Sequence, residues 1–441
     1  MWNASGPIGI SSLAPKQRLT GGTRAGAAGV TAAMADSCAA RFAEGEPSRF
    51  ALATAGRRIA ASGVRHRLEP GPAHTLAERV RRFFAAERSC CAPELLVGAL
   101  PFDRMADDFL FQPETLTETS PSAAPAIAGL PSHRWRVRPE PTRAQYQAMV
   151  GRALKLIAGS RDAETPLSKI VLSRSLLLQA DADIDLARLY NGLRGDPGAV
   201  RFMTPLGPGA DGRPRHLVGA TPELLLRKTG AAILSHPLAG SARRSSDAEE
   251  DRAAADGLVR SMKDQREHRW VVEAILDGLA PYCTSLSAPQ APTLVSTRTM
   301  WHLGTMIEGR LKNADEVSSA ELAAVLHPTP AVGGTPRDQA MALIPELEGY
   351  DRGFYAGAVG WTDRAGDGDW FVSLRCAEVS GPYARVYAGA GIVEGSDPAE
   401  EVDETSAKLQ AILRALGVEE EGLSPMPPAG ETAHSDKRIA G

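Results

Sequence analysis

The sequence predicts an α+β fold built on largely antiparallel sheets. Strand-like patterns gather in two blocks, residues 168–240 and 353–395. Helical patterns gather between and after these blocks, around 247–280 and over 398–416. Strands and helices that segregate in this way, instead of alternating one by one, are typical of α+β proteins. No internal repeat is visible, so a solenoid or a propeller is not predicted.

The first part of the chain contains a mixture of elements. Residues 49–64 alternate like a pair of strands joined by a turn, and 75–87 have the periodicity of an amphipathic helix. The apolar run 94–103 predicts a buried strand. The polar, proline-rich stretch 112–142 predicts a loop, and a further helix is predicted over 143–159.

The rest of the chain supplies most of the sheets. The first block contains strand patterns over 168–179, 199–206, 216–230 and 231–240. Long helices are predicted around 247–280, and a shorter one over 318–325. The second block has strand patterns over 353–363, 369–381 and 383–395, and the helix 398–416 closes the fold.

Composition excludes several classes of protein. The chain has 441 residues, 43% of them hydrophobic, which is enough for a large core. It has no apolar run long enough to span a membrane, and a net charge of −4 argues against a nucleic-acid binder. The five cysteines are scattered without a C-x-x-C pair, so we expect neither a disulfide framework nor a zinc or iron–sulfur site. A reducing compartment fits best, and we expect a cytoplasmic protein.

One folded domain is predicted over residues 46–417. Residues 1–35 contain no Asp or Glu and are rich in Ala, Gly and Ser, and we interpret 1–45 as a disordered extension. A transit peptide is one alternative, and a later start at Met34 is another. The polar, proline-rich segment 418–441 is predicted to be a disordered tail.

Two acidic residues occupy unexpected positions in the helical stretch KDQREHRWVVEAIL, residues 263–276. Asp264 and Glu267 lie three residues apart and continue the apolar stripe that contains Val271. Carboxylates on the inward face of a helix cost several kcal/mol unless they are paired. These two side chains therefore need partners inside the fold.

A second acidic pair of the same spacing occurs in the helix predicted over 398–416. Glu401, Glu404 and Lys408 fall on one face of that helix. Two such helices can bring four carboxylates together, and oxygen ligands without Cys or His suit Mg²⁺. Judged by spacing alone, two solvated helix faces explain the same pattern.

A family resemblance strengthens the metal hypothesis. It extends from about residue 48 to 416 and rests on seven motifs in order: SKIVLSR, GATPELLLRK, HPLAGSARR, KDQREH, LHPTPAVGGTP, FVSLRCAEV and AGAGIVEGSDPAEEVDETSAKL. Together they resemble the chorismate-utilising enzymes, and within them the isochorismate synthases. The resemblance implies one chorismate-binding catalytic domain over 46–417, with two large, mostly antiparallel sheets packed together and helices outside. The family includes monomers, and we expect a monomer here.

In that family an Mg²⁺ ion holds the ring carboxylate of chorismate. The resemblance implies that Glu267 and Glu404 bind the ion directly and that Asp264 and Glu401 bind it through water. A dication at this point would offset the cost of burying the acids, and it would act as a Lewis acid and a template.

The resemblance also implies a catalytic pair for adding water to the ring. Lys169, in a strand between Ser168 and Ile170, matches the base, because burial favours a neutral amine that accepts a proton from water. Glu223, followed by three leucines, matches the acid, because apolar surroundings favour a protonated carboxyl. The alternatives are a lysine at a strand edge that reaches solvent and a glutamate in a turn after Pro222.

Seven further residues match substrate-binding positions of the family: Gly240, His302, Ala331, Tyr355, Arg375, Gly389 and Lys408. Arg375 resembles a clamp on the pyruvyl carboxylate, which suits the planar fork of arginine. His302 resembles a histidine near the ring carboxylate and the 4-hydroxyl, and Tyr355 is placed near the pyruvyl end. Gly389, with Gly391, would let backbone amides approach the substrate.

Each of these residues also has a structural explanation. Arg375 could sit in a surface ion pair, and His302 and Tyr355 could belong to the core. Lys408 is spaced for an ion pair with Glu404 one helical turn away. Glycines in a strand, such as Gly389, also mark bulges.

The motifs favour one reaction of the family, the Mg²⁺-dependent conversion of chorismate to isochorismate. Ala239 stands where aminodeoxychorismate synthases carry a nucleophilic lysine. The segment 327–338 differs from the motif that is typical of anthranilate synthases. The product would feed siderophore (2,3-dihydroxybenzoate or salicylate) or menaquinone biosynthesis. A salicylate synthase, which shares Tyr355 and also eliminates pyruvate, remains an alternative. A catalytically inactive chorismate-binding protein is another.

Overall fold

The computed structural model describes residues 49–86, 92–119, 133–196, 198–209, 211–418 and 423–426. The extension predicted over 1–45 lies outside these residues. In the part described, no helix is long and apolar enough to cross a membrane. Cys283 and Cys376 are buried free thiols.

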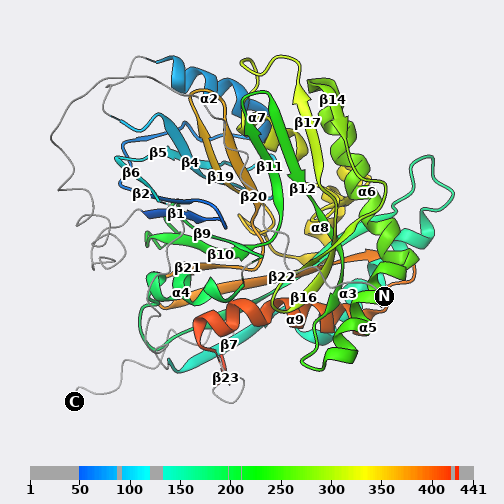
Figure 1. Ribbon diagram of the computed structural model, residues 1–441. Coiled ribbons are helices and arrows are strands. Elements are labelled where there is room, and N and C mark those ends of the chain that lie inside the picture. The colour runs from blue at the N-terminus through cyan, green and yellow to red at the C-terminus, as the bar shows by residue number, and fades with distance from the viewer. Residues whose placement is uncertain are drawn as a thin grey trace, which may run out of the picture. The chain divides into compact units, whose positions relative to one another are not determined.

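The larger sheet has eleven strands and contains both ends of the described chain (Figure 1). Its order is β23 (Leu423–Pro425), β7 (Trp135–Glu140), β8 (Lys169–Gln179), β22 (Tyr383–Val393), β21 (Cys376–Ser380), β10 (Arg215–Thr221), β9 (Val200–Leu206), β1 (Arg49–Ala53), β2 (Arg58–Ser62) and β6 (Thr115–Thr119), with β18 (Gly334–Thr335) added to β8. β23 pairs with β7 in parallel, whereas the long pairs β8–β22 and β9–β10 are antiparallel. The longest pairing, β8–β22, runs through the centre of the candidate site.

Two further sheets are antiparallel. The nine-stranded sheet has the order β14 (Cys283–Ser287), β17 (Ile307–Leu311), β12 (Ala232–His236), β11 (Leu224–Thr229), β20 (Gly368–Val372), β19 (Ala358–Asp363), β4 (Leu95–Leu100), β5 (Phe109–Gln112) and β3 (His66–Arg67). The three-stranded sheet has the order β13 (Leu238–Arg243), β16 (Met300–Gly304) and β15 (Thr293–Ser296). Pro237 alone separates β12 from β13, so the chain passes directly from one sheet to the other.

The helices cover the sheets. They are α2 (Leu76–Ala85), α3 (Arg143–Gly159), α4 (Leu186–Gly192), α5 (Ala248–Arg260), α6 (Met262–Leu279), α7 (Ser319–Leu326), α8 (Arg337–Glu348) and α9 (Pro398–Leu416). α9, red in Figure 1, packs against β22 and α3, while α7 packs against β11 and β20 of the nine-stranded sheet. α6 contacts β13 and β22. The two acid-bearing helices therefore meet the same central strand, β22.

The ends of α6 and α9 follow ordinary capping rules. Ser261 ends α5 and caps α6, where its hydroxyl accepts a hydrogen bond from the Asp264 amide. Asp397 caps α9, Pro398 occupies its first turn, and Gly417 ends it in the left-handed conformation. These signals fix where the acidic residues fall along each helix.

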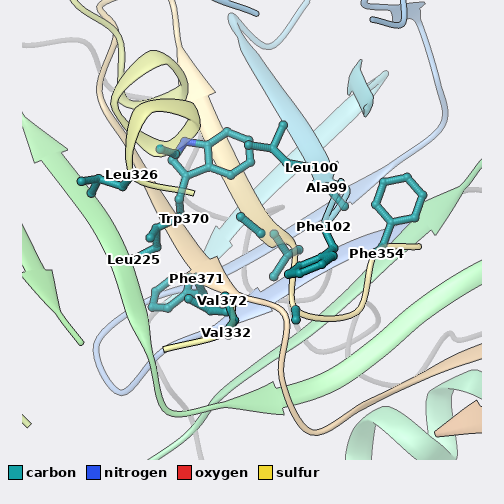
Figure 2. Packing of buried hydrophobic residues seen from close by; sticks show 14 of the residues in the cluster. Ala99, Leu100, Phe102, Leu225, Leu326, Val332, Phe354, Trp370, Phe371 and Val372 are labelled. Carbon is teal, nitrogen blue, oxygen red and sulfur yellow. The ribbon is translucent and has the colours of Figure 1, made fainter. Parts of the chain in front are cut away.

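A shared hydrophobic core joins the two large sheets. It contains Phe50 and Phe202 from the eleven-stranded sheet and Val97 and Trp370 from the nine-stranded sheet. Figure 2 shows Trp370, Phe371 and Val372 of β20 among aliphatic and aromatic neighbours from other elements. The shared core confirms the predicted α+β fold of two packed sheets.

Two of the differences from the sequence-based expectation lie in segments that were predicted to lack regular structure. The loop predicted over 112–142 contains β6 and β7, while residues 120–132 lie outside the described part. β6 is an edge strand with mostly exposed side chains, so it lacks the apolar alternation that marks a half-buried strand. In the tail predicted to be disordered, Leu423–Pro425 form a strand on β7, so these three residues are paired.

We expect Trp370→Ala to lower the free energy of unfolding by about 3–5 kcal/mol, because a fully buried indole would be replaced by a cavity. A urea titration followed by circular dichroism measures the change. Met105→Ala, at a side chain that is 68% exposed, serves as the control and should shift stability by less than about 0.5 kcal/mol. Equal losses in both variants would contradict the assigned core.

Candidate active site

A cavity lies where β8 and β22 meet β13, β16, α6 and α9. Thirteen residues that the sequence singled out line it: Glu223, Gly240, Asp264, Glu267, His302, Ala331, Tyr355, Arg375, Gly389, Gly391, Glu401, Glu404 and Lys408. These residues are separated by up to 185 positions in the chain, and only the fold brings them together. Lys169 does not line the cavity itself but contacts Glu267, which does.

Lys169 is completely buried at the start of β8. Its Nζ lies 2.9 Å from Oε1 of Glu267, and its side chain has no solvent exposure. A lysine at a strand edge that reaches solvent is therefore excluded. The backbone of β22 passes alongside, since Val393 is the register partner of Lys169.

Glu223 is buried in the turn between β10 and β11. Only 3% of the residue is exposed, so a turn glutamate that faces water is also excluded. Burial raises the pKa of the Glu223 carboxyl to about 8, although the nearby charge of Lys169 opposes the shift. At neutral pH this carboxyl is mostly protonated and has a proton to give.

Three of the four acids on α6 and α9 are paired with lysines. Glu401 accepts a hydrogen bond of 3.2 Å from Lys263, and Glu404 accepts one of 2.6 Å from Lys408. Glu267 is the partner of Lys169. Of the two acids on α6 that were predicted to need internal partners, Glu267 therefore has an amine, whereas Asp264 makes no ion pair with a lysine of the described chain.

The lysines compensate the negative charge of the four acids, Asp264, Glu267, Glu401 and Glu404, only in part. Burial and the neighbouring Glu404 raise the pKa of Glu401, and burial together with two acidic neighbours raises that of Asp264. Burial also opposes ionisation of Glu404, but Lys408 and Ser241 hold its pKa below the ordinary value. The negative charges repel one another, and a further cation among them would be stabilising.

The donor set fits a hard cation, although the side chains are not arranged as a finished metal centre. Among the described residues, no three His, Cys, Asp or Glu side chains are already gathered as ligands. Each lysine contacts only Oε1 of its glutamate, so the second carboxylate oxygen would remain for an ion. Oxygen donors alone, in the wall of a polar cavity, match the preference of Mg²⁺, which keeps several waters.

Arg375 is held in position to bind an anion. Its Nη2 donates to Nε2 of His302 over 2.6 Å, and its buried Nη1 has no hydrogen-bond partner among the described residues. Asp196 lies 3.9 Å from Nη1. The backbone of Arg375 has φ +48°, a conformation that costs a non-glycine residue of order 1–3 kcal/mol and is concentrated at functional sites.

Electrostatics keep His302 neutral. Burial and the adjacent guanidinium of Arg375 lower the pKa of His302 well below its usual range. A neutral imidazole can accept the Arg375 hydrogen bond at Nε2 only when its own proton is on Nδ1. The arrangement leaves Nη1 of Arg375 without a hydrogen bond, so its N–H groups remain for a carboxylate.

The remaining predicted residues form the walls. Tyr355 stacks on Tyr387 with ring centres 4.7 Å apart. Lys408 donates to the Gly389 carbonyl as well as to Glu404. A Cβ atom on Gly391 would lie 2.3 Å from Oε1 of Glu267, so any side chain there would displace the carboxylate. Glycine is needed at 391 because the Glu267 carboxylate lies so close to the backbone, and not because the strand has a bulge there.

Several lining residues were not predicted from the sequence. Lys263 and Ser241 hold Glu401 and Glu404, and Arg352 and Val332 also line the cavity. Lys263 directly precedes Asp264, and Ser241 directly follows Gly240, so their positions beside predicted residues were a usable signal. Nothing in the local sequence marks Arg352.

The chain matches the family model described as "Chorismate binding enzyme" over residues 102–417. It is 40% identical over 388 residues to isochorismate synthase DhbC of Bacillus subtilis (strain 168), which covers 85% of this chain and 95% of the relative. Among solved structures, DhbC from Bacillus anthracis is 37% identical with a TM-score of 0.79, covering 87% of this chain and all of that one. The menaquinone-specific isochorismate synthase MenF from Escherichia coli is 25% identical with a TM-score of 0.70, over 84% of this chain and 88% of that one.

The chain therefore belongs to the family of chorismate-binding enzymes. Within that family, this chain is similar to the three isochorismate synthases named above over nearly their whole length.

Proposed function

We propose that this protein is an isochorismate synthase, an isomerase that converts chorismate to isochorismate. The observation that carries the proposal is the pair of Lys169 and Glu223: a carboxyl with a pKa of about 8 lines the cavity, and a buried amine contacts Glu267 in the cavity wall. The names of relatives that are 37–40% identical over most of the chain support the same activity.

In the proposed reaction Lys169 takes a proton from water, whose oxygen then bonds to ring carbon 2. The double bonds of the ring shift, and the bond from carbon 4 to its hydroxyl breaks. Glu223 donates its proton to the departing hydroxyl, which leaves as water. The proton taken up by one residue is matched by the proton released from the other, so the overall conversion is an isomerisation.

Binding groups hold the substrate in place for this transfer. Arg375 directs its unpaired Nη1 at a substrate carboxylate, and Lys408 adds positive charge to the site. To act as the base, Lys169 must loosen its contact with Glu267. That contact uses Oε1 of Glu267, and the second oxygen of the carboxylate would be left for a metal.

Glu267 and Glu404 would bind Mg²⁺ directly, with Asp264 and Glu401 acting through water. The bound ion would neutralise the substrate's ring carboxylate and fix its orientation. Burial and, after it, the neighbouring acids raise the pKa values of Asp264 and Glu401, which supports a cation at this position.

The cavity favours water over an amine as the nucleophile. Ala239 lines it where a covalent-amine mechanism would need a lysine. The relatives include proteins named for 2,3-dihydroxybenzoate and for menaquinone, so the product would enter siderophore or menaquinone biosynthesis. Salicylate synthesis remains the second candidate, because Tyr355 lies in the cavity wall.

Product analysis tests the proposal. Purified protein incubated with chorismate and Mg²⁺ should yield isochorismate, and Lys169→Ala should lower the rate at least about a hundredfold because the variant lacks the proposed base. Lys228→Ala removes another buried, ion-paired lysine and should keep its rate per folded molecule. Salicylate with pyruvate would support the second candidate, and unchanged chorismate would support a binding protein. Turnover near wild type in Lys169→Ala would remove that residue from the role of base.

The acid should appear in the pH profile. Because Glu223 acts only when protonated and its pKa is about 8, we expect kcat to fall as the pH rises through about 8. Glu223→Gln cannot donate this proton, so it should lose most activity at every pH. Rates measured between about pH 6 and pH 10 give the profile. An alkaline limb that is the same in Glu223→Gln as in wild type would assign the titration to another group.

Metal dependence should respond to Glu404. We expect Glu404→Gln to raise the Mg²⁺ concentration needed for half-maximal activity at least about tenfold, because one charged ligand is lost. Titration calorimetry with Mg²⁺ measures the binding without turnover. Glu400→Gln, on the exposed face of the same helix, is the matched control and should bind as wild type does. An unaltered titration in Glu404→Gln would exclude it as a ligand.

A further inference from the structure

We propose that Arg352, paired with Glu348, is a positioning residue. It holds the strand that carries Lys169 against the segment that carries Ala331. It thereby sets the distance between the base and the part of the cavity wall that contains Ala331. The inference rests on the proposed function. No sequence signal pointed to either residue, and neither is among the predicted site residues.

The pair is fully enclosed. The side chains of Arg352 and Glu348 are 1% and 0% exposed. Glu348 is the last residue of α8, and Arg352 follows four positions later, after Gly349 has ended the helix. Nε of Arg352 donates to Oε2 of Glu348 over 2.9 Å, and Nη2 donates to Oε1 over 2.6 Å. This two-point contact fixes the plane of the guanidinium.

The other side of the guanidinium joins two separate segments. Nη2 donates to the Val171 carbonyl over 2.7 Å, and Nη1 donates to the Val332 carbonyl over 2.8 Å. Val171 lies two residues after Lys169 on β8, so their side chains point to the same face of the strand. Val332 follows Ala331, and both line the cavity.

Glu348 holds a second point of β8 through hydrogen bonds with Ser173. Its Oε1 accepts hydrogen bonds from the Ser173 amide (2.6 Å) and the Ser173 hydroxyl (2.9 Å). The same hydroxyl lies 2.6 Å from the hydroxyl of Tyr350. Two points on β8, Val171 and Ser173, are therefore fixed by one ion pair.

Lysine cannot reproduce this geometry. Four N–H···O bonds diverge from Arg352 in one plane, and Phe102 covers a face of that plane at 4.2 Å. An ammonium keeps the charge but has no planar fork. Replacing Arg352 by lysine should therefore loosen β8 against the Val332 segment without removing the positive charge.

The consequence should fall on kcat more than on KM. Arg375, which would bind the substrate carboxylate, is hydrogen-bonded to His302 and has no bond to Arg352. Substrate binding should persist when Arg352 changes, whereas Lys169 would be displaced from its place beside the ring. A misplacement of about 1 Å costs on the order of a hundredfold in rate.

The chain offers a closely matched control. Arg79 and Asp108 form another buried pair, with side chains 4% and 2% exposed. Arg79 also donates to three backbone carbonyls, those of Glu69, Gly71 and Pro72. None of these five residues lines the cavity. Arg79→Lys removes the same kind of fork and reports the effect of lost stability alone.

Steady-state kinetics with chorismate compares Arg352→Lys and Arg79→Lys after both are shown to be folded by circular dichroism. We expect kcat of Arg352→Lys to fall about ten- to a hundredfold with KM changed less than about threefold, while Arg79→Lys keeps both constants. Equal kcat in the two variants would overturn the proposal. If Arg352→Lys does not fold, the double variant Arg352→Met with Glu348→Met removes the pair without leaving an unpaired charge. Wild-type kcat in that variant would also overturn it.

Hydrogen exchange provides a readout that does not depend on turnover. In Arg352→Lys the amides of Val171 and Ser173 should exchange faster than in wild type, and in Arg79→Lys they should not change. Unaltered exchange at both amides would overturn the positioning role. A wild-type protein that consumes no chorismate would instead overturn the proposed function, so the two failures are distinguishable.

Discussion

The burial of carboxylates beside β22 is the constraint on which the site depends. Glu267 can approach this strand only because Gly391 has no side chain, and the same gap admits Lys169 from the neighbouring strand. Each buried charge would be costly alone, so the fold supplies an amine for three of the four acids.

Opposite electrostatic demands are met within one cavity. Four buried or half-buried acids on α6 and α9 favour a cation, because burial and their own repulsion raise the pKa values of Asp264 and Glu401. A buried arginine beside a neutral histidine favours an anion. Burial also lets Glu223 keep its proton. Charges of both signs therefore face the same space, and they would orient an anionic substrate as well as bind it.

Sequence patterns predicted regular elements well and irregular ones poorly. The helices 143–159 and 398–416 match α3 and α9 exactly, because capping residues and apolar periodicity are local properties. The edge strand β6 and the short β23 were missed, because their pairing depends on a neighbour far along the chain. For the site, family motifs singled out thirteen residues of the cavity wall, but the roles assigned to them stay predictions.

By itself, the sequence determined the class of the fold, the family and the identity of the chemical groups, since these depend on residue type and spacing along the chain. Only the tertiary structure decided which groups meet. The pairing of Lys169 with Glu267, 98 positions apart, and the fastening of β8 by Arg352 both arise from contacts between distant segments. Burial, which turns an ordinary glutamate at 223 into a proton donor, is likewise a property of the packed molecule, because it depends on what surrounds the side chain and not on its neighbours in sequence.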